Sequence, residues 1–154
     1  EVGTFSEWSS LSQIIIPLSI ILISKYSFYK CNSLRQIIIP SSVTEIENNA
    51  FEQCTLLEQV SISSSSLTKI ETEVFKECSS LMEIVIPSSI SSIASKAFYN
   101  CSSMKKIAIF SSQIDVMKDV SDKCSALEQI SIPKDLKLDL NNIGIDPQIE
   151  VNYI

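Results

Sequence analysis

The five cysteines are the residues whose chemistry and spacing stand out first in this chain. Cys31, Cys54, Cys78, Cys101 and Cys124 recur at a nearly constant interval in a chain of 154 residues. Cysteines at regular spacing can form disulfides, bind zinc or act as nucleophiles. A disulfide framework is disfavoured because the count is odd and because side chains at equivalent points of a repeat run parallel. The five residues are therefore expected to be reduced thiols.

Histidine is absent from the chain. A zinc site is disfavoured for this reason and because there is no Cys-x-x-Cys pair. Without histidine, neither a Ser-His-Asp nor a Cys-His nucleophilic site can be built. The acidic residues are dispersed, and the two glycines form no phosphate-binding loop. The sequence therefore predicts no catalytic site, no metal site and no cofactor, and the protein is not expected to be an enzyme.

The cysteines belong to a repeat with the frame Phe-x-x-Cys-x-x-Leu-x-x-Ile-x-Ile. The frame starts at residues 5, 28, 51, 75, 98 and 121, with degenerate first and last copies. All steps between these starts are equal except the one from 51 to 75, which is longer by one position and coincides with the serine run at residues 63–66. Repeats of this length form solenoids, in which stacked coils share one continuous core.

Each copy predicts one coil. A short strand carries alternating inward residues, and a proline that cannot donate a ladder hydrogen bond follows it. Two aliphatic residues then face inward from the opposite wall, and an Ala-Phe-x-x-Cys segment forms one side of a single helical turn. In one coil these positions are Leu34, Ile37, Ile39, Pro40, Val43, Ile46, Ala50, Phe51 and Cys54. The cysteines should form a buried column at roughly 4.8 Å per coil, with Trp8 in the same position of the first coil, and act as small hydrophobic residues.

The pattern resembles the leucine-rich repeat superfamily and, within it, the BspA-like class, whose repeat is similar to A-F-x-x-C-x-x-L-x-x-I-x-I-P-x-x-[VLI]-x-x-I. The resemblance covers about residues 5–133. Ser42 and Ser89 stand near the point where the commoner pattern has Asn or Cys after the strand. The resemblance implies the α/β fold class: a right-handed solenoid of about six 23-residue coils. It also implies a parallel sheet on the concave face and short helical turns or irregular structure on the convex face.

The chain is expected to form a single domain, residues 1–154. Its parts are a degenerate N-terminal coil at residues 5–27, regular coils at 28–120, and a last coil with a C-terminal cap at 121–154. The coil between Phe98 and Ser121 is expected to be weak, because Ser121 stands where other coils have Phe and Phe110 stands where others have Pro. Loss of a buried Phe costs about 3–5 kcal/mol unless neighbours fill the space, and Met117 is the expected filler.

The outward residues of the strands are the candidate protein-binding site. They combine polar side chains with an apolar stripe formed by Ile15, Ile38 and Val85. These three residues have no structural need to be apolar. The alternative is that the stacked glutamines only bond to one another and that short residues suit a tight curve. The predicted binding residues are Gln13, Ile15, Arg35, Gln36, Ile38, Glu58, Gln59, Met82, Glu83, Val85, Lys105, Lys106 and Gln129.

A second apolar patch is formed by Leu18, Ile21 and Leu22. It indicates either contact with a preceding coil or a self-association surface. Asn100 begins an Asn-Cys-Ser glycosylation pattern, which we expect to be unused because Cys101 belongs to the buried column. Changes at convex residues, represented by Glu47, Asn48 and Lys96, are expected to alter stability by less than about 0.5 kcal/mol.

The net charge of −6 disfavours nucleic acid and a membrane surface as partners. The longest apolar run, residues 14–23, is also too short for a membrane-spanning helix, which needs roughly 20 residues. The resemblance implies a protein-interaction module of a cell-surface or secreted protein that binds host or matrix proteins. The alternative is an intracellular scaffold with an unknown protein partner, which would be cytoplasmic, and unpaired thiols favour it.

Overall fold

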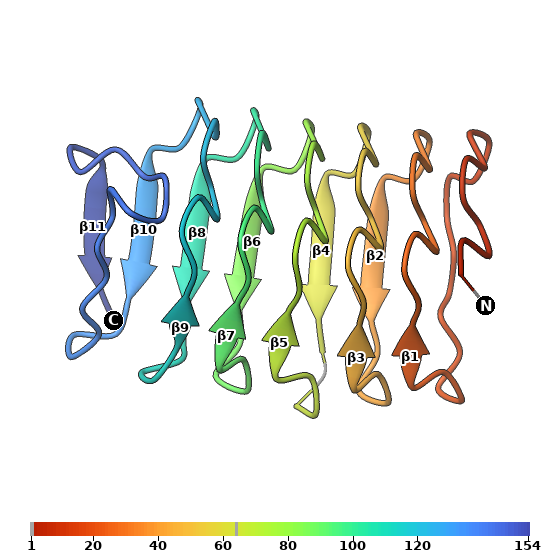
Figure 1. The fold of residues 1–154 in the computed structure, drawn as a ribbon, viewed down its shortest axis with the longest axis horizontal. Coiled ribbons are helices and arrows are strands. Elements are labelled where there is room, and N and C mark those ends of the chain that lie inside the picture. The colour runs from red at the N-terminus through yellow and green to blue at the C-terminus, as the bar shows by residue number, and fades with distance from the viewer. Residues whose placement is uncertain (1, 64) are drawn as a thin grey trace.

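The structure is a computed structural model that describes residues 2–63 and 65–154. These residues form a row of stacked coils that runs from the N-terminal coil to β11 (Figure 1). One wall carries the longer strands: β2 (Gln36–Ile39), β4 (Gln59–Ile62), β6 (Glu83–Ile86), β8 (Lys106–Ile109), β10 (Gln129–Ile132) and β11 (Glu150–Tyr153). A second wall carries short strands: β1 (Leu22–Ile23), β3 (Glu45–Ile46), β5 (Lys69–Ile70), β7 (Ser92–Ile93) and β9 (Asp115–Val116).

All paired strands are parallel, and each pairs with the strand one coil away. In the long-strand wall, Gln36 lies opposite Gln59, and Lys106 opposite Gln129. The predicted solenoid, with one coil for each copy of the repeat frame, is therefore confirmed. The hydrogen-bonded ladder is interrupted at one coil boundary: β2 and β4 form one sheet, and β6, β8, β10 and β11 form another. The short strands divide one coil earlier, into β1–β3 and β5–β7–β9, because β3 lies in the coil of Phe28 and β5 in the coil of Phe51.

A third wall joins each short strand to the next long strand, and we call it the turn wall (residues 24–34, 47–57, 71–81, 94–104 and 117–127). The predicted helical turn is not found here, and the described residues contain no helix. The α/β assignment is therefore wrong, and the described fold is built of strands and turns. The turns have left-handed backbone at two positions per coil, two residues before and two after the frame residue.

Left-handed residues prevent a helix because every helical residue must have negative φ. Eleven non-glycine residues have φ between 56° and 63°: Glu7, Tyr26, Lys30, Asn49, Gln53, Glu73, Glu77, Lys96, Asn100, Asp119 and Lys123. The local bonds close four-residue β-turns, as from Cys54 N to Phe51 O at 3.2 Å. Other amides donate to the next coil, as Phe51 N does to Val74 O at 2.9 Å. The backbone thus satisfies its bonds between coils instead of within a helix.

The core contains a stack of phenylalanine rings along the turn wall. Phe5, Phe28, Phe51, Phe75 and Phe98 lie with neighbouring ring centroids 5.0–5.7 Å apart and planes within 14° of parallel. The outermost ring, Phe5, is half-buried, and the other four are buried. Offset stacking of this kind adds about 0.5–1.5 kcal/mol per pair beyond the burial of area.

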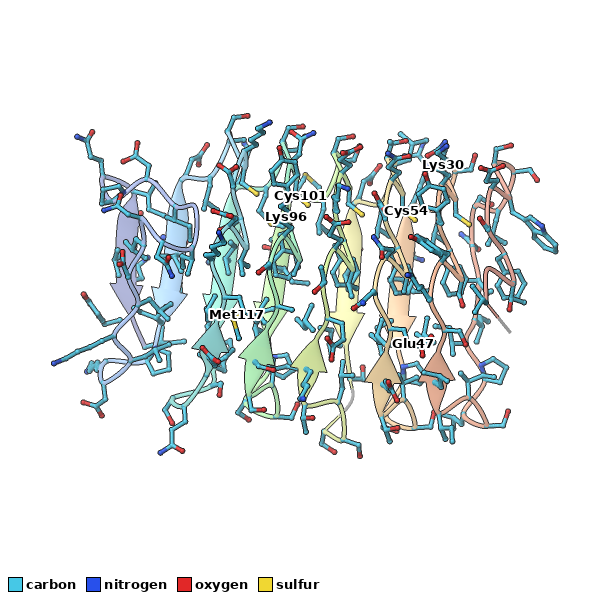
Figure 2. All side chains as sticks on the ribbon, viewed as in Figure 1. Lys30, Glu47, Cys54, Lys96, Cys101 and Met117 are labelled. Carbon is cyan, nitrogen blue, oxygen red and sulfur yellow. The ribbon has the colours of Figure 1, made fainter. Side chains whose placement is uncertain are left out.

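Ser121 continues the phenylalanine column but is fully buried without an aromatic ring. Its hydroxyl donates to Ile143 O at 3.1 Å. Gly144 follows, with φ of 81°, and a Cβ there would lie 2.6 Å from the backbone nitrogen of Asp122. The backbone of the C-terminal segment therefore occupies the space of the missing ring. Met117 was the wrong filler, since it is 43% exposed, just after β9 (Figure 2). One of the two reasons for expecting a weak coil is thereby removed, while Phe110 still stands in place of the usual Pro.

The two ends of the row differ from the sequence-based expectation. The predicted strand of the first coil is absent, since residues 12–16 form no strand, although Arg35 N donates to Ser12 O at 3.5 Å. Trp8 has no buried position in the cysteine column, because it lies in the outermost coil and is 55% exposed. At the other end β11 pairs with β10, with Val151 opposite Ile130. The C-terminal segment therefore adds a shortened coil.

Candidate functional site

The outward side chains of the long-strand wall form the surface that we call the long-strand face. The pleat places the predicted binding residues there, since alternate residues of each strand point away from the core. Eleven of the thirteen are exposed, and Glu58 and Gln129 are half-buried. Strand pairing brings Glu83, Lys106 and Gln129 side by side. Gln13 and Ile15 lie outside the ladder, because the first coil has no strand.

A groove of about 400 Å³ crosses this face from β4 to β11. Its lining is mostly charged or polar, and Met82, which is 43% exposed, is its apolar member. The sequence did not identify Glu150, because this residue lies in the C-terminal segment outside the repeat frame. The lining residues are Glu58, Gln59, Met82, Glu83, Lys105, Lys106, Glu128, Gln129 and Glu150.

The bonds across the face do not form the glutamine ladder that was the structural alternative. Among the described residues no hydrogen bond joins two glutamines. Gln129 donates instead to the Glu150 carboxylate at 3.1 Å, and Arg35 forms an ion pair with Glu58 at 2.5 Å. Both interactions are exposed, so each contributes little to stability. The identity of the outward residues is therefore not explained by bonding along the ladder.

The apolar residues expected on this face are exposed. Ile15 is 90% exposed, Ile38 is 60% exposed and Val85 is 48% exposed. Ala108 and Ser131, at the equivalent positions of β8 and β10, are buried. Both have short side chains and lie on the two interior strands of the four-stranded sheet. The exposed apolar surface therefore lies on the N-terminal and central coils.

The cysteine column lies behind the turn wall, where all five residues are buried and unpaired as disulfides. Figure 2 shows Cys54 and Cys101 at corresponding points of their coils. Each thiol donates a hydrogen bond to the carbonyl of the preceding coil's phenylalanine, at 3.0–3.2 Å. The acceptors are, in order, Phe5, Phe28, Phe51, Phe75 and Phe98. Cysteine is thus a donor here as well as a small apolar residue, and the regular offset between each Phe and the Cys of the next coil was its signal in the sequence.

The environment of the thiols makes most of them poor nucleophiles. Burial raises the pKa of Cys31 to about 11, against a smaller lowering by the Trp8 amide. Burial likewise raises the pKa of Cys54, Cys78 and Cys101. A hydrogen bond from Cys101 lowers the pKa of Cys124.

Two convex residues that were expected to be neutral have structural roles. Glu47 accepts a hydrogen bond from Lys25 N at 2.7 Å and so holds the turn of the preceding coil. Lys96 has φ of 60°, and its ammonium lies 5.8 Å from the centroid of the Tyr99 ring. Asn48 is exposed, as expected. Figure 2 shows Glu47 and Lys96 on the same side of the stack.

The N-terminal end presents a mainly apolar hollow. It measures about 450 Å³, and its lining includes Phe5, Ile16 and Leu22. Leu18 and Ile21 beside it are 72% and 64% exposed, and Leu22 is 39% exposed. These are the residues of the second predicted patch.

No cluster of three or more Cys, Asp or Glu side chains within residues 2–63 and 65–154 is arranged to hold a metal ion. The same residues include no helix of the length and apolarity needed to cross a membrane. Asn100 is half-buried in a left-handed turn, next to the fully buried Cys101.

Comparison with known proteins identifies the repeat. Residues 1–128 match the BspA type leucine rich repeat region, in six copies. A leucine rich cell surface protein from Faecalibacterium prausnitzii is 30% identical, with a TM-score of 0.72, and the match covers 87% of this chain and 35% of that one. The T. pallidum leucine rich repeat protein is 28% identical, with a TM-score of 0.65, over 79% of this chain and 56% of that one.

A leucine-rich repeat protein from Eubacterium ventriosum shares the fold, with 22% identity and a TM-score of 0.68, over 81% of this chain and 34% of that one. No curated protein matches the sequence. The chain thus spans between about a third and just over half of the length of these solved relatives. Since the family match extends over six repeats and most of the sequence, the chain belongs to the BspA-type leucine-rich repeat family.

Proposed function

We propose that the protein is a non-catalytic interaction module that binds a protein partner through its long-strand face. The observation that carries the proposal is the exposure of Ile38 and Val85, at 60% and 48%, among charged and polar side chains. An apolar centre within a polar rim is the usual composition of a protein-binding surface. Members of the leucine-rich repeat family are generally protein-interaction modules, which supports the same proposal.

The proposed setting is a cell-surface or secreted protein that binds host or matrix proteins. The description of the Faecalibacterium prausnitzii relative as a cell surface protein supports this setting. An intracellular scaffold is the alternative, and five thiols without disulfides favour it.

The test uses Ile38→Asp combined with Val85→Asp. A carboxylate at each position should abolish binding while leaving the fold intact, because both side chains point away from the core. Wild-type and variant proteins would be immobilised and exposed to an extracellular-matrix preparation and, separately, to a cytosolic extract. Retention of the same proteins by both would contradict the assignment of the face.

A matched control is Asn48→Asp, which introduces one carboxylate at an exposed convex position. It should retain every partner of the wild-type protein. Circular dichroism and the unfolding midpoint of each variant separate loss of binding from loss of fold. Specific retention from the matrix preparation favours the surface setting, and retention from the cytosolic extract favours the scaffold.

The N-terminal hollow supports a second candidate function, self-association. Leu18 and Ile21 are more exposed than soluble monomers usually leave neighbouring large aliphatic side chains. A second copy of the chain that packs on this end would cover them together with the apolar hollow.

A further inference from the structure

The contact between residues 2–63 and residues 65–154 differs from the coil contacts on either side of it, and we call it the seam. It coincides with the longer repeat step. β4 and β6 face each other across it without ladder pairing, and so do β3 and β5. The long-strand wall is therefore interrupted between the coils of Phe51 and Phe75, and the short-strand wall one coil earlier, between those of Phe28 and Phe51. Figure 1 shows β4 and β6 as neighbours in the row.

The hydrogen bonds that enter the long strands show the interruption directly. Glu58 N donates to Arg35 O at 2.8 Å, and Lys105 N donates to Met82 O at 2.7 Å. In the described part of the chain, no equivalent bond from Met82 or Glu83 reaches Glu58. The short-strand wall loses the equivalent bonds at Thr68 and Glu71. Ladder pairing is thus absent from two of the three walls at the seam, among the residues that the structure describes.

The packing is also looser at the seam. Val60 and Ile62 are half-buried. The counterparts of Val60, Ile37 and Ile84, are 1% exposed, and those of Ile62, Ile39 and Ile86, are fully buried. A groove of about 390 Å³ lies between β4 and β6, and one of about 240 Å³ lies between β3 and β5. The inward side chains of β4 therefore reach solvent through a gap in the long-strand wall.

The turn wall, in contrast, is bonded continuously across the seam. Phe51 N donates to Val74 O at 2.9 Å, and Gln53 N donates to Lys76 O at 2.8 Å. The rings of Phe51 and Phe75 stack at 5.4 Å, within the range of the other pairs. The backbone and aromatic contacts of this wall are thus the same here as elsewhere.

Side-chain bonds reinforce the turn wall at the seam. Asn49 donates to the Glu73 carboxylate at 2.9 Å, and Gln53 donates to Glu77 at 2.9 Å. The Lys76 ammonium lies 3.0 Å from Glu52, whose side chain is 10% exposed. Charge-assisted bonds between side chains this well buried are stronger than surface ion pairs. This polar clamp joins the two coils along one wall.

We propose that the seam is a hinge about which the N-terminal and C-terminal blocks of the solenoid rotate. The turn wall is the pivot, because its bonds and its clamp hold the two blocks together. The two strand-bearing walls open and close, because no ladder bond must break when they separate. Since the long-strand face crosses the seam, rotation changes the angle between its two halves. The hinge is a property of the chain itself and does not depend on the proposed binding function.

The experiment measures distances across the seam on two walls by pulsed electron spin resonance. One spin-labelled pair, Gln36→Cys with Gln129→Cys, reports on the long-strand wall. The matched pair, Asn32→Cys with Ser125→Cys, reports on the turn wall between the same two coils. Both pairs span four coil steps, or roughly 20 Å at about 4.8 Å per step. All four positions are exposed or half-buried. Both pairs are made with Cys124→Ser, because the pKa of Cys124 is lowered, and labelling at neutral pH spares the other four buried thiols, whose pKa is raised.

The hinge predicts a broad distance distribution for the long-strand pair and a narrow one for the turn-wall pair. A rigid stack would give the same width for both, and that result would overturn the proposal. Deletion of Ser65 supplies a second test, because it restores the step length of the other coils. If this variant folds, β4 should pair with β6 and the long-strand distribution should narrow to the width of the turn-wall pair. An unchanged broad distribution in the folded deletion variant would also contradict the hinge.

Discussion

At the scale of single residues, the cysteine thiols explain why one position of the repeat is so constant. Each thiol fills a small apolar space and donates to a carbonyl that also accepts an amide bond, as Phe51 O does from Cys54 N. Valine would fill the same space and alanine would leave part of it empty, but neither side chain could donate a hydrogen bond. The sequence predicted the burial of the column, but it could not show the acceptor, because the acceptor is a backbone atom of another coil.

The buried thiols should make the protein sensitive to alkaline pH. Burial raises the pKa of Cys31 from 9.0 to about 11 in the folded protein, so the unfolded chain releases this proton first. Below pH 9 the thiol is protonated in both states and has no effect. As pH rises from 9 to 11, the unfolded state is favoured by up to about 1.4 kcal/mol per pH unit. Urea unfolding across this range, under reducing conditions, measures the effect.

The control for this prediction is Cys31→Ser, whose hydroxyl keeps a donor but does not titrate in this range. The difference in unfolding free energy between wild type and variant should fall as pH rises from 9 to 11. Parallel pH curves for the two proteins would show that Cys31 ionises equally easily in both states.

At the scale of elements, the strands were predictable and the turns were not. Alternation of residues such as Ile37 and Ile39 identifies a strand from the sequence alone, because only one face can be buried. The Ala-Phe-x-x-Cys spacing fits one helical turn equally well, and this led to the wrong α/β assignment. Left-handed positions are hard to predict when they are occupied by Lys, Glu, Gln and Tyr. Bonds between coils fix these turns, and a local pattern contains no information about those bonds.

The left-handed turns predict that the usual stability order of Ala and Gly variants is inverted at Lys96. At an ordinary position Gly is less stable than Ala by roughly 0.5–1 kcal/mol. At φ of 60° the left-handed backbone penalises Ala by about 1–2 kcal/mol and does not penalise Gly. Lys96→Gly should therefore be more stable than Lys96→Ala by about 0.5–1 kcal/mol, as measured by urea unfolding. Both variants lack the ammonium, so its contact with Tyr99 does not affect the comparison.

Ser88 provides the control, since it is exposed and its φ is not positive. There Ser88→Ala should be more stable than Ser88→Gly. The same order at both positions would show that the turn backbone relaxes away from the left-handed region.

At the scale of the whole molecule, the two ends of the solenoid are unlike each other. The C-terminal end covers the core with an additional strand and with backbone that approaches Asp122 closely through Gly144. The N-terminal end leaves Trp8, Leu18 and Ile21 exposed. The sequence predicted the apolar N-terminal patch from its departure from the repeat. It could not predict the strand at the C-terminal end, because those residues follow no repeat frame.

The exposed N-terminal end predicts association between copies of the chain. The wild-type protein should form a dimer that becomes more populated with concentration in sedimentation velocity. Leu18→Asp combined with Ile21→Asp should give a monomer of unchanged fold, because the carboxylates would be buried without partners in the dimer. Ile38→Asp, on the long-strand face, should leave the dimer intact. If the wild-type protein sediments as a monomer at every concentration, self-association is not a function of this end.

The bonds between coils join residues that are close in the chain, about one coil apart, however long the row becomes. A force that pulls on the two ends of the chain is therefore resisted by one coil boundary at a time. A coil occupies roughly 4.8 Å along the row while folded. When the residues of one coil detach, they extend to roughly 80 Å at about 3.3–3.6 Å per residue. Under tension the molecule should therefore lengthen in equal steps, each from the loss of a single coil, while the remaining coils stay folded.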